Sequence, residues 1–278
     1  MPNRKDLNFV FFGTPDVANE TLTILKNSGY IPTLIVTAPD KPQGRNLVLT
    51  APPVKNWAIE NNIPYIQPEK ITLEELKITS SDLFIVVAYG KILPENIIIF
   101  PQNGCLNIHY SLLPKYRGAS PVESAILHGD TETGVTIQKM EYKMDSGPIV
   151  AQEKTIIPPD EKASDLKKRL IQIGGDLLVK TLPDFIDGKI ECVKQNEEQS
   201  TYCAKIKKEN GLVDLEKDLP ENIYNKFRAY ATWPRTFFFK DNKRIIITDA
   251  VMEDGKFTIK KVLPEGKKEI DYLLFLSQ

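Results

Sequence analysis

Asn107 and His109 are two polar side chains whose types and spacing suit chemistry on a carbonyl group. They alternate with the apolar Leu106 and Ile108, so a β-strand would place the carboxamide and the imidazole on the same face. Pro114 follows soon after, and it cannot continue a strand because it lacks the backbone N–H of a ladder. The pattern predicts a polar pair at a strand end that opens into a loop, where open parallel sheets place their chemistry.

The carboxylate that best complements this pair is Asp145, in an Asp-Ser-Gly turn after an apolar strand-like run. An amide, an imidazole and a carboxylate together suit acyl transfer to an amine. The Asn107 amide and a protonated His109 can donate hydrogen bonds to the oxyanion of a tetrahedral intermediate, and loss of one such donor typically costs about 10²–10³ in rate. Asp145 can orient the imidazole and help to move the proton that leaves the amine.

A purely structural interpretation of the same residues also exists. Asn107 can cap the end of a strand, His109 can be a hydrogen-bonded core histidine, and Asp145 can be an ordinary turn residue. His128, at the end of an expected helix, suits a structural position favoured by the helix dipole. The spacing alone leaves both interpretations of the first three residues open.

Composition excludes several other classes of protein. The 36 Lys and Arg residues nearly cancel the 37 Asp and Glu residues, so the net charge favours neither nucleic acid nor membranes. Three cysteines without a CxxC spacing and only two histidines argue against a metal site and for a reduced, cytoplasmic protein. The apolar run at 9–12 is too short for a secretory signal or a membrane span. No GxGxxG, GxxxxGK[ST] or GxSxG motif is present.

The elements that must position the polar residues form a repeating strand–helix pattern, which predicts an α/β fold with a doubly wound, mostly parallel sheet. Strands are expected at 8–12, 34–37, 63–66, 83–88, 106–109, 134–140 and 149–152, and helices at 53–61, 73–77, 119–129 and 164–185. We expect this domain to span 1–188, with a polar linker at 189–208. Residues 209–278 are expected to form a small β-rich domain, with a helix at 219–231 and short strands at 237–239, 244–248 and 257–262.

A family resemblance supports the catalytic interpretation. The segment 107–118 reads Asn-x-His-x-Ser-Leu-Leu-Pro-x-x-Arg-Gly and, with the Asp-x-Gly at 145–147, resembles the signature of the folate-dependent formyltransferases. The segments at 11–16, 39–45 and 87–90 resemble that family as well, as does Trp233-Pro234 in the second domain. The resemblance covers essentially the whole chain, and its parts occur in the family's order.

The resemblance implies a formyl donor and a set of site residues. The donor would be the cosubstrate 10-formyltetrahydrofolate, with no metal, and the catalytic residues would be Asn107, His109 and Asp145. The residues implied along the folate are Ser111, Leu112, Leu113 and Pro114 in the loop, and Val87, Tyr89 and Gly90 around the pterin. The run that contains Val87 also suits a plain core strand, and part of it must be one.

Within the family, the chain most resembles the members that formylate methionyl initiator tRNA. Its loop at 38–50 resembles the insertion that holds the acceptor end of the tRNA, where Lys41 and Arg45 would contact phosphates. The C-terminal domain resembles an oligonucleotide-binding (OB-like) β-barrel, but it is shortened after Ala250. No membrane and no obligate protein partner are expected. Two alternatives are a folate-dependent N-formyltransferase for a nucleotide-linked amino sugar and a non-catalytic folate- or RNA-binding relative.

Overall fold

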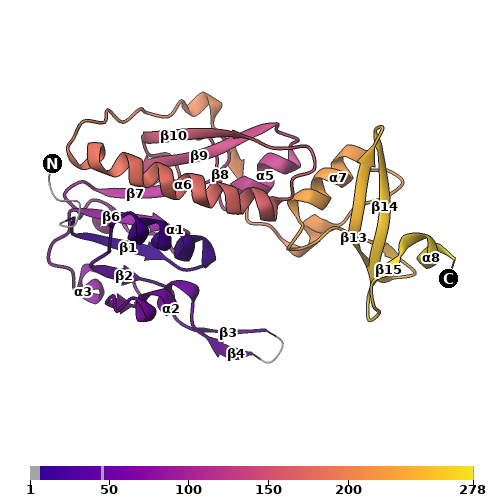
Figure 1. The fold of residues 1–278 in the computed structure, drawn as a ribbon, viewed down its shortest axis with the longest axis horizontal. Coiled ribbons are helices and arrows are strands. Elements are labelled where there is room, and N and C mark those ends of the chain that lie inside the picture. Colours follow the sequence, from indigo (N-terminus) through magenta and orange to yellow (C-terminus); the bar gives the residue numbers. More distant parts are fainter. Residues whose placement is uncertain (1–6, 45–46, 278) are drawn as a thin grey trace. The chain divides into compact units, whose positions relative to one another are not determined.

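The computed structural model describes residues 7–44 and 47–277, and the chain divides into two compact units (Figure 1). The first unit takes its residues from Met1–Arg117, Gly134–Lys154 and Lys168–Thr201. The second takes its residues from Gly118–Thr133, Thr155–Lys167 and Tyr202–Gln278. The two units therefore interleave along the sequence, and each is described separately below.

Within the described residues, the first unit is built on a seven-stranded sheet in the order β10-β9-β7-β6-β1-β2-β5. Its strands are β1 (Phe9–Gly13), β2 (Leu34–Val36), β5 (Tyr65–Ile66), β6 (Leu83–Val87), β7 (Cys105–His109), β9 (Glu132–Lys139) and β10 (Ile149–Ile156). The pairings of β5, β2, β1, β6 and β7 are parallel, whereas β9 runs antiparallel to β7. The expected mostly parallel sheet is confirmed.

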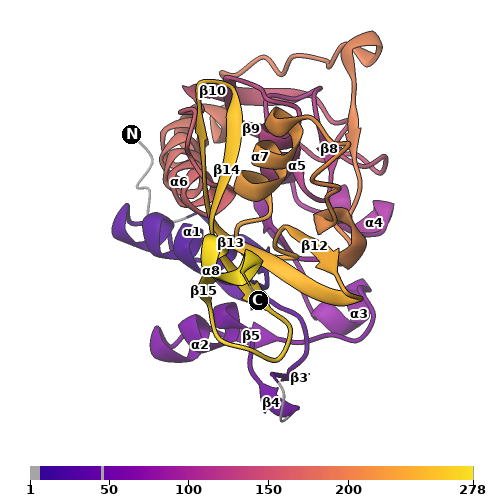
Figure 2. The same cartoon turned by 90° about the vertical axis from the view of Figure 1, so that its right-hand side faces the viewer.

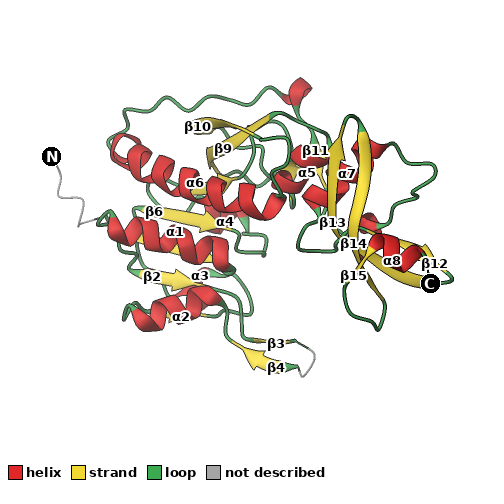
Figure 3. Cartoon of the chain, turned by 45° about the vertical axis from the view of Figure 1, so that its right-hand side comes forward, coloured by secondary structure: helices red, strands yellow, loops and turns green. Residues whose placement is uncertain are grey.

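Helices cover both faces of this sheet, which explains why β1 and β6 are buried along their whole length. The helices of the first unit are α1 (Asp16–Asn27), α2 (Pro53–Glu60), α3 (Leu73–Leu76), α4 (Glu95–Ile98) and most of α6 (Ala163–Ile186). Helices α1, α2 and α6 lie on one side of the sheet (Figure 3). Helix α6 passes so close that a Cβ added at Gly174 would lie 3.0 Å from Ile108 on β7.

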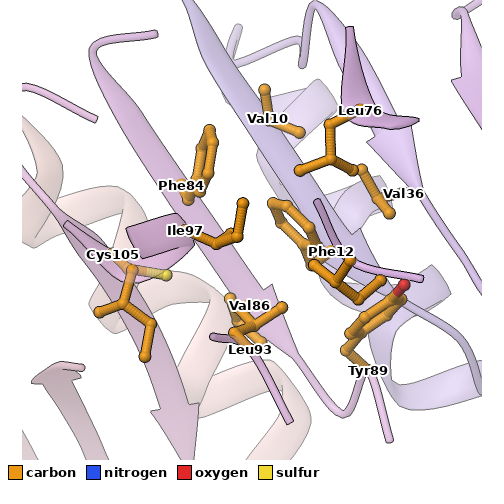
Figure 4. Packing of buried hydrophobic residues seen from close by; sticks show 12 residues of the cluster. Val10, Phe12, Val36, Leu76, Phe84, Val86, Tyr89, Leu93, Ile97 and Cys105 are labelled. Atoms are coloured by element: carbon orange, nitrogen blue, oxygen red, sulfur yellow. The ribbon is translucent and has the colours of Figure 1, made fainter. Parts of the chain in front are cut away.

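The opposite face of the sheet carries an apolar cluster beneath α3 and α4 (Figure 4). Phe12 and Phe84 lie at its centre, with ring centroids 5.1 Å apart, and Leu76 and Ile97 pack over them from the two helices. Burying each side chain of this size stabilises the fold by about 1.5–3 kcal/mol. Cys105 at the start of β7 belongs to the same cluster, so the polar residues that follow it begin where this core ends.

The segment 38–50, expected to be a loop, contains a short hairpin of β3 (Lys41–Gln43) and β4 (Val48–Thr50). Its base is fixed by Asp40, which accepts hydrogen bonds from Lys55 at 2.7 and 2.9 Å and from Gln67 at 2.7 Å. Gly44, at φ +70°, supplies the left-handed backbone of the turn. The hairpin projects from the sheet next to α2 (Figure 1). Arg45 lies outside the described residues.

The second unit contains an antiparallel sheet in the order β12-β13-β14-β15 (Figure 2). Its elements are α5 (Pro121–Leu127), α7 (Pro220–Ala229), β12 (Phe237–Lys240), β13 (Lys243–Glu253), β14 (Lys256–Pro264), β15 (Ile270–Asp271) and α8 (Tyr272–Leu276). Phe227 of α7 packs with Ile247 and Val262 of the sheet in one apolar core. The tight turn expected after Ala250 lies at Asp254 and Gly255, both of which have positive φ. The expected barrel appears in the described residues as these four antiparallel strands.

The segment expected to be a linker has local structure of its own. It contains the 3₁₀ turn η2 (Glu197–Gln199) and β11 (Tyr202–Cys203), and a second 3₁₀ turn, η3 (Lys208–Gly211), begins at its end. Strand β11 pairs with the short β8 (Arg117–Gly118), which follows the loop after β7. Among the described helices, none is both long and apolar enough to cross a membrane.

Candidate active site

Strand β7 places Asn107 and His109 on one polar face of the sheet. In the antiparallel ladder with β9, Asn107 lies opposite Gln138 and His109 lies opposite Thr136. Directly opposed residues of a ladder share a face, so four polar side chains lie together next to the apolar cluster. The Asn107 carboxamide makes no hydrogen bond with residues 7–44 or 47–277, and its N–H groups are therefore available to a substrate.

The imidazole of His109 lies between two acceptors and is 5 % exposed. Its Nε2 is 2.9 Å from the carbonyl oxygen of Tyr116, and its Nδ1 is 3.7 Å from Oδ2 of Asp145. Because a carbonyl oxygen only accepts hydrogen bonds, Nε2 must carry a proton and donate a hydrogen bond to the Tyr116 carbonyl. Nδ1 then faces the carboxylate, and a proton taken up at Nδ1 would lie between the ring and Asp145. The predicted association of His109 with Asp145 is present in the structure.

Asp145 is held by its own turn and by Gln138. Its backbone has φ +50°, an uncommon value for a residue with a side chain. Nε2 of Gln138 donates a hydrogen bond of 2.9 Å to Oδ1, which leaves Oδ2 to face His109. At Gly147 an added Cβ would lie 1.9 Å from the carbonyl oxygen of Lys139, so the turn can pack on the end of β9 only with glycine there.

A cavity of about 310 Å³ opens beside this carboxylate. It is lined by Lys91, Ile92, Leu93, Ile98, Gln138, Met140, Glu141, Tyr142, Met144 and Asp145. The wall is mostly apolar, as in sites that bind flat organic molecules. Oε1 of Gln138 is buried and has no hydrogen-bond partner among the described residues. A buried acceptor without a partner is costly, and a ring N–H of a pterin could satisfy it. The cavity therefore fits the aromatic head of a folate.

The seven residues that the sequence implied for folate binding lie elsewhere than on the wall of this cavity. Val87 and Tyr89 are buried at and beyond the end of β6, and Tyr89 packs edge-on against Phe12 in the core. Burial raises the pKa of Tyr89 to about 12. Gly90 follows at φ +81°. Their role in folate binding remains a prediction, whereas the core position that was also considered for this run is present.

The loop after β7 is fastened by the hydroxyl of Thr136. This hydroxyl donates to the Ser111 carbonyl at 2.7 Å and accepts from the backbone N–H of Leu113 at 3.1 Å. The Ser111 side chain donates to the Lys115 carbonyl. Leu112 is half-buried, Leu113 is buried, and the peptide bond between Leu113 and Pro114 is cis.

Sequence reasoning missed three residues that support the site: Gln138, Arg117 and Gln195. Gln138 could have been found from the strand alternation, because it shares a face with Thr136. Arg117 is fully buried and donates two hydrogen bonds each to Gln195 and to Glu197. No local signal marks Gln195, which lies in a polar run.

The carboxylate of Glu197 gives one testable consequence. Hydrogen bonds from Arg117 and then from Lys143 lower the pKa of Glu197 from 4.5 to about 2. A folded-state pKa below the unfolded value means that ionised Glu197 stabilises the fold above pH 4.5, and that this contribution is lost as the pH falls toward 2. We expect E197Q to lose less stability than the unmodified protein between about pH 5 and about pH 3, measured by urea midpoints. Equal losses in the two proteins would contradict this assignment.

Comparison with known proteins is consistent across the chain. The sequence model of the family described as "Formyl transferase" matches residues 7–182, and that of "Formyl transferase, C-terminal domain" matches residues 205–271. The methionyl-tRNA formyltransferase of Geobacter sulfurreducens is 39% identical over 269 residues, which covers 94% of this chain and 84% of that protein.

Two solved structures share the fold at low sequence identity. The methionyl-tRNA formyltransferase from Clostridium thermocellum matches with a TM-score of 0.62 at 18% identity, covering 95% of this chain and 99% of that one. An N-formyltransferase from Helicobacter canadensis, solved with folinic acid and dTDP-3-aminofucose, matches with a TM-score of 0.66 at 22% identity, covering 89% of each chain.

Proposed function

This chain belongs to the formyl transferase family, and we propose that it transfers the formyl group of 10-formyltetrahydrofolate to the α-amino group of methionyl initiator tRNA. The observation that carries the proposal is the association of His109 with Asp145, at the edge of a mostly apolar cavity. The identity of 39% to a methionyl-tRNA formyltransferase over 94% of the chain supports the choice of acceptor.

Formyl transfer to an amine makes three chemical demands. A bond forms between the amine nitrogen and the formyl carbon, the bond from that carbon to the folate nitrogen breaks, and one proton passes from the amine to the departing nitrogen. Charge develops on the formyl oxygen while the first bond forms, so donors fixed near that oxygen accelerate the reaction. The folate supplies the activated formyl group when bound.

The residues of the polar face can meet these demands. Asn107 supplies unengaged amide N–H groups that can donate to the developing oxyanion. His109 is fixed through Nε2 to Tyr116, so its Nδ1 side faces Asp145, where a proton can be held. Asp145 is in turn oriented by Gln138. We assign proton handling to the His109–Asp145 pair and oxyanion stabilisation to Asn107. The expected hydrogen bond from His109 to the oxyanion is not part of this proposal, because Nε2 faces the Tyr116 carbonyl and Nδ1 faces Asp145.

Formylation of a nucleotide-linked amino sugar would require the same chemistry. The enzyme solved with dTDP-3-aminofucose is only 22% identical to this chain, so the match supports a shared fold but not a shared substrate. The match to the C-terminal formyl transferase domain over 205–271 and the identity to methionyl-tRNA formyltransferases favour the tRNA acceptor. A non-catalytic role is disfavoured by the joint presence of Asn107, His109 and Asp145.

The test is an assay of the full chain with 10-formyltetrahydrofolate and two acceptors in parallel. We expect formyl transfer to methionyl initiator tRNA and none to a nucleotide-linked 3-amino sugar. Uncharged initiator tRNA, which lacks the α-amine, is the matched control for the acceptor. Transfer to the sugar alone would establish the alternative function, and transfer to neither would contradict both.

We place the tRNA contacts of the first unit on the hairpin of β3 and β4. Lys41 is exposed on β3, and its ammonium group would contribute a phosphate contact without sequence preference. K41A should weaken tRNA binding with kcat unchanged, and should reduce the slope of log affinity against log salt by about one. Lys180, exposed on α6, gives the matched control K180A, which should leave both quantities unchanged. An unaltered salt slope in K41A would exclude this contact.

The domain roles follow from the same proposal. Residues 1–188 would form the catalytic domain and 209–278 a tRNA-binding domain, joined by the segment 189–208. The family matches over 7–182 and 205–271 support this division, whereas the division into compact units assigns 118–133 and 155–167 to the second unit. We also propose a cytoplasmic location, where charged tRNA is available.

A further inference from the structure

A buried amide, that of Gln195, binds the backbone of the turn that carries Asp145. Gln195 is 4 % exposed, and its Nε2 donates to the carbonyl oxygens of Asp145 at 2.9 Å and of Gly147 at 2.7 Å. One side-chain amide therefore holds both ends of the three-residue turn. These are backbone contacts, so they act on the path of the chain rather than on the carboxylate itself.

The orientation of this amide is fixed by Arg117. Nε and Nη2 of the fully buried Arg117 donate to Oε1 of Gln195 at 3.1 and 2.8 Å. A guanidinium group cannot accept a hydrogen bond, so the oxygen of Gln195 must face Arg117 and its NH₂ group must face the turn. A flipped amide would set donor against donor on one side and oxygen against two carbonyl oxygens on the other.

We propose that Arg117 and Gln195 form a positioning relay that sets the distance between the Asp145 carboxylate and His109. Asp145 has a left-handed backbone, φ +50°, which the rest of the structure must impose. The two hydrogen bonds from Gln195 hold the carbonyl groups on either side of Ser146 in the orientation that this backbone requires. The carboxylate then reaches Gln138 and His109 from above the polar face. This inference rests on the proposed function.

Glu197 provides a contrast within the same cluster. Its carboxylate accepts hydrogen bonds from Nη1 and Nη2 of Arg117 at 3.1 and 2.7 Å. Its side chain is 51% exposed and also accepts a hydrogen bond of 2.9 Å from the side chain of Lys143, two residues before Asp145. In the part of the chain that the structure describes, Glu197 makes no hydrogen bond to Asp145 or Gly147 themselves. Glu197 therefore balances the charges of Arg117 and Lys143, whereas Gln195 alone of the two binds the backbone of Asp145 and Gly147.

The two residues allow a matched pair of isosteric exchanges, Q195E and E197Q, in the full chain. Q195E keeps an acceptor for Arg117 but replaces both donors with an oxygen that faces two carbonyl oxygens. The turn should then move, and kcat should fall by about 10–100-fold, because a small misplacement of a catalytic group is enough for such a loss. KM for the folate and for the tRNA should change little. E197Q should retain most of the activity.

A second readout is independent of the substrate. The chain has two histidines, His109 and His128, so ¹⁵N spectra of histidine-labelled protein contain two sets of ring signals. Q195E should shift the His109 signals and leave those of His128, which lies in the second unit, unchanged. If the unmodified protein formylated no tRNA, the proposed function would fail, and the spectra would still test the relay.

Two results would overturn the relay. One is a Q195E protein with normal kcat and unshifted His109 signals. The other is an equal loss of kcat in Q195E and E197Q that follows their loss of thermal stability, which would indicate a structural role only. If Q195E did not fold, R117K would replace it, because a lysine keeps the charge but cannot hold Gln195 and Glu197 with a planar fork. R117K should lower kcat and shift His109 in the same way.

Discussion

Replacing His109 by alanine is expected to lower kcat by about 10²–10⁴-fold, the usual contribution of a group that handles protons in the transition state. The variant should keep its fold, because the removed ring leaves a small space at a strand end, outside the apolar cluster of Figure 4. It does leave the Tyr116 carbonyl without its donor, so a modest loss of stability should accompany the loss of rate. Single-turnover formylation and thermal unfolding measure the two effects separately.

His128 provides the control for this experiment. It lies at the end of α5 in the second unit, where its Nδ1 is 2.8 Å from the Ser124 carbonyl, and H128A should retain normal kcat. If H109A kept a rate within a few-fold of the unmodified protein, the assignment of His109 would be wrong.

Replacing Asp145 by asparagine is expected to have an effect of the same order, about 10²–10⁴-fold in kcat. The exchange keeps the size of the side chain and leaves an oxygen for Gln138, but it removes the charge that faces Nδ1 of His109. KM for both substrates should change less than kcat, because the proposed role is exercised in the transition state. Steady-state kinetics with each substrate varied in turn will separate the two parameters.

The double variant H109A/D145N decides whether the two residues act as one unit. Groups that work together in catalysis are strongly non-additive, so the double variant should lose little more than either single variant. If the fold-loss of kcat in the double variant equalled the product of the two single losses, Asp145 and His109 would act independently, which would contradict the proton-handling pair.

The sheet of the first unit could be predicted because its strands carry their own signal. Phe9–Gly13 and Leu83–Val87 are apolar at nearly every position, which is typical of strands covered on both faces. The pair Asn107 and His109 was found from alternation within a single strand. These inferences use local pattern only. The strands and the shared face of Asn107 and His109 are confirmed, whereas the catalytic roles of the two residues stay predictions.

The hairpin of β3 and β4 was missed because its local signals resemble those of a loop. Pro42 and Gly44 punctuate the segment, and Pro42 lacks the N–H group that most strand residues supply. The two strands are only three residues long and pair with no further strand among the described residues, so a proline is tolerated there. What fixes the hairpin is the Asp40–Lys55 ion pair at its base, a contact 15 residues apart in sequence.

Two supporting residues of the site, Arg117 and Gln195, could not be predicted because their partners are distant in sequence. Gln195 contacts Arg117, 78 residues earlier, and the turn at Asp145, 50 residues earlier. In the sequence it is one glutamine in a polar segment, with the appearance of a solvated residue. For Gln138, alternation along its strand shows that it shares a face with Thr136. Its position opposite Asn107 depends on the register of the folded sheet, since shifting the pairing by one residue would turn it to the other face.

The antiparallel course of β9 has a consequence for the geometry of the site. Lys139, near the end of β9, lies opposite Leu106 near the start of β7, so the chain leaves β9 at the far end of the strand that carries His109. Residues 140–144 must therefore turn the chain back toward the polar face before Asp145 can meet the ring. The number of residues in this segment therefore limits how closely the Asp145 carboxylate can approach His109. One inserted residue adds up to about 3.3–3.6 Å of chain, comparable to the whole distance between the two groups. Natural variation in length should therefore be confined to loops outside this segment.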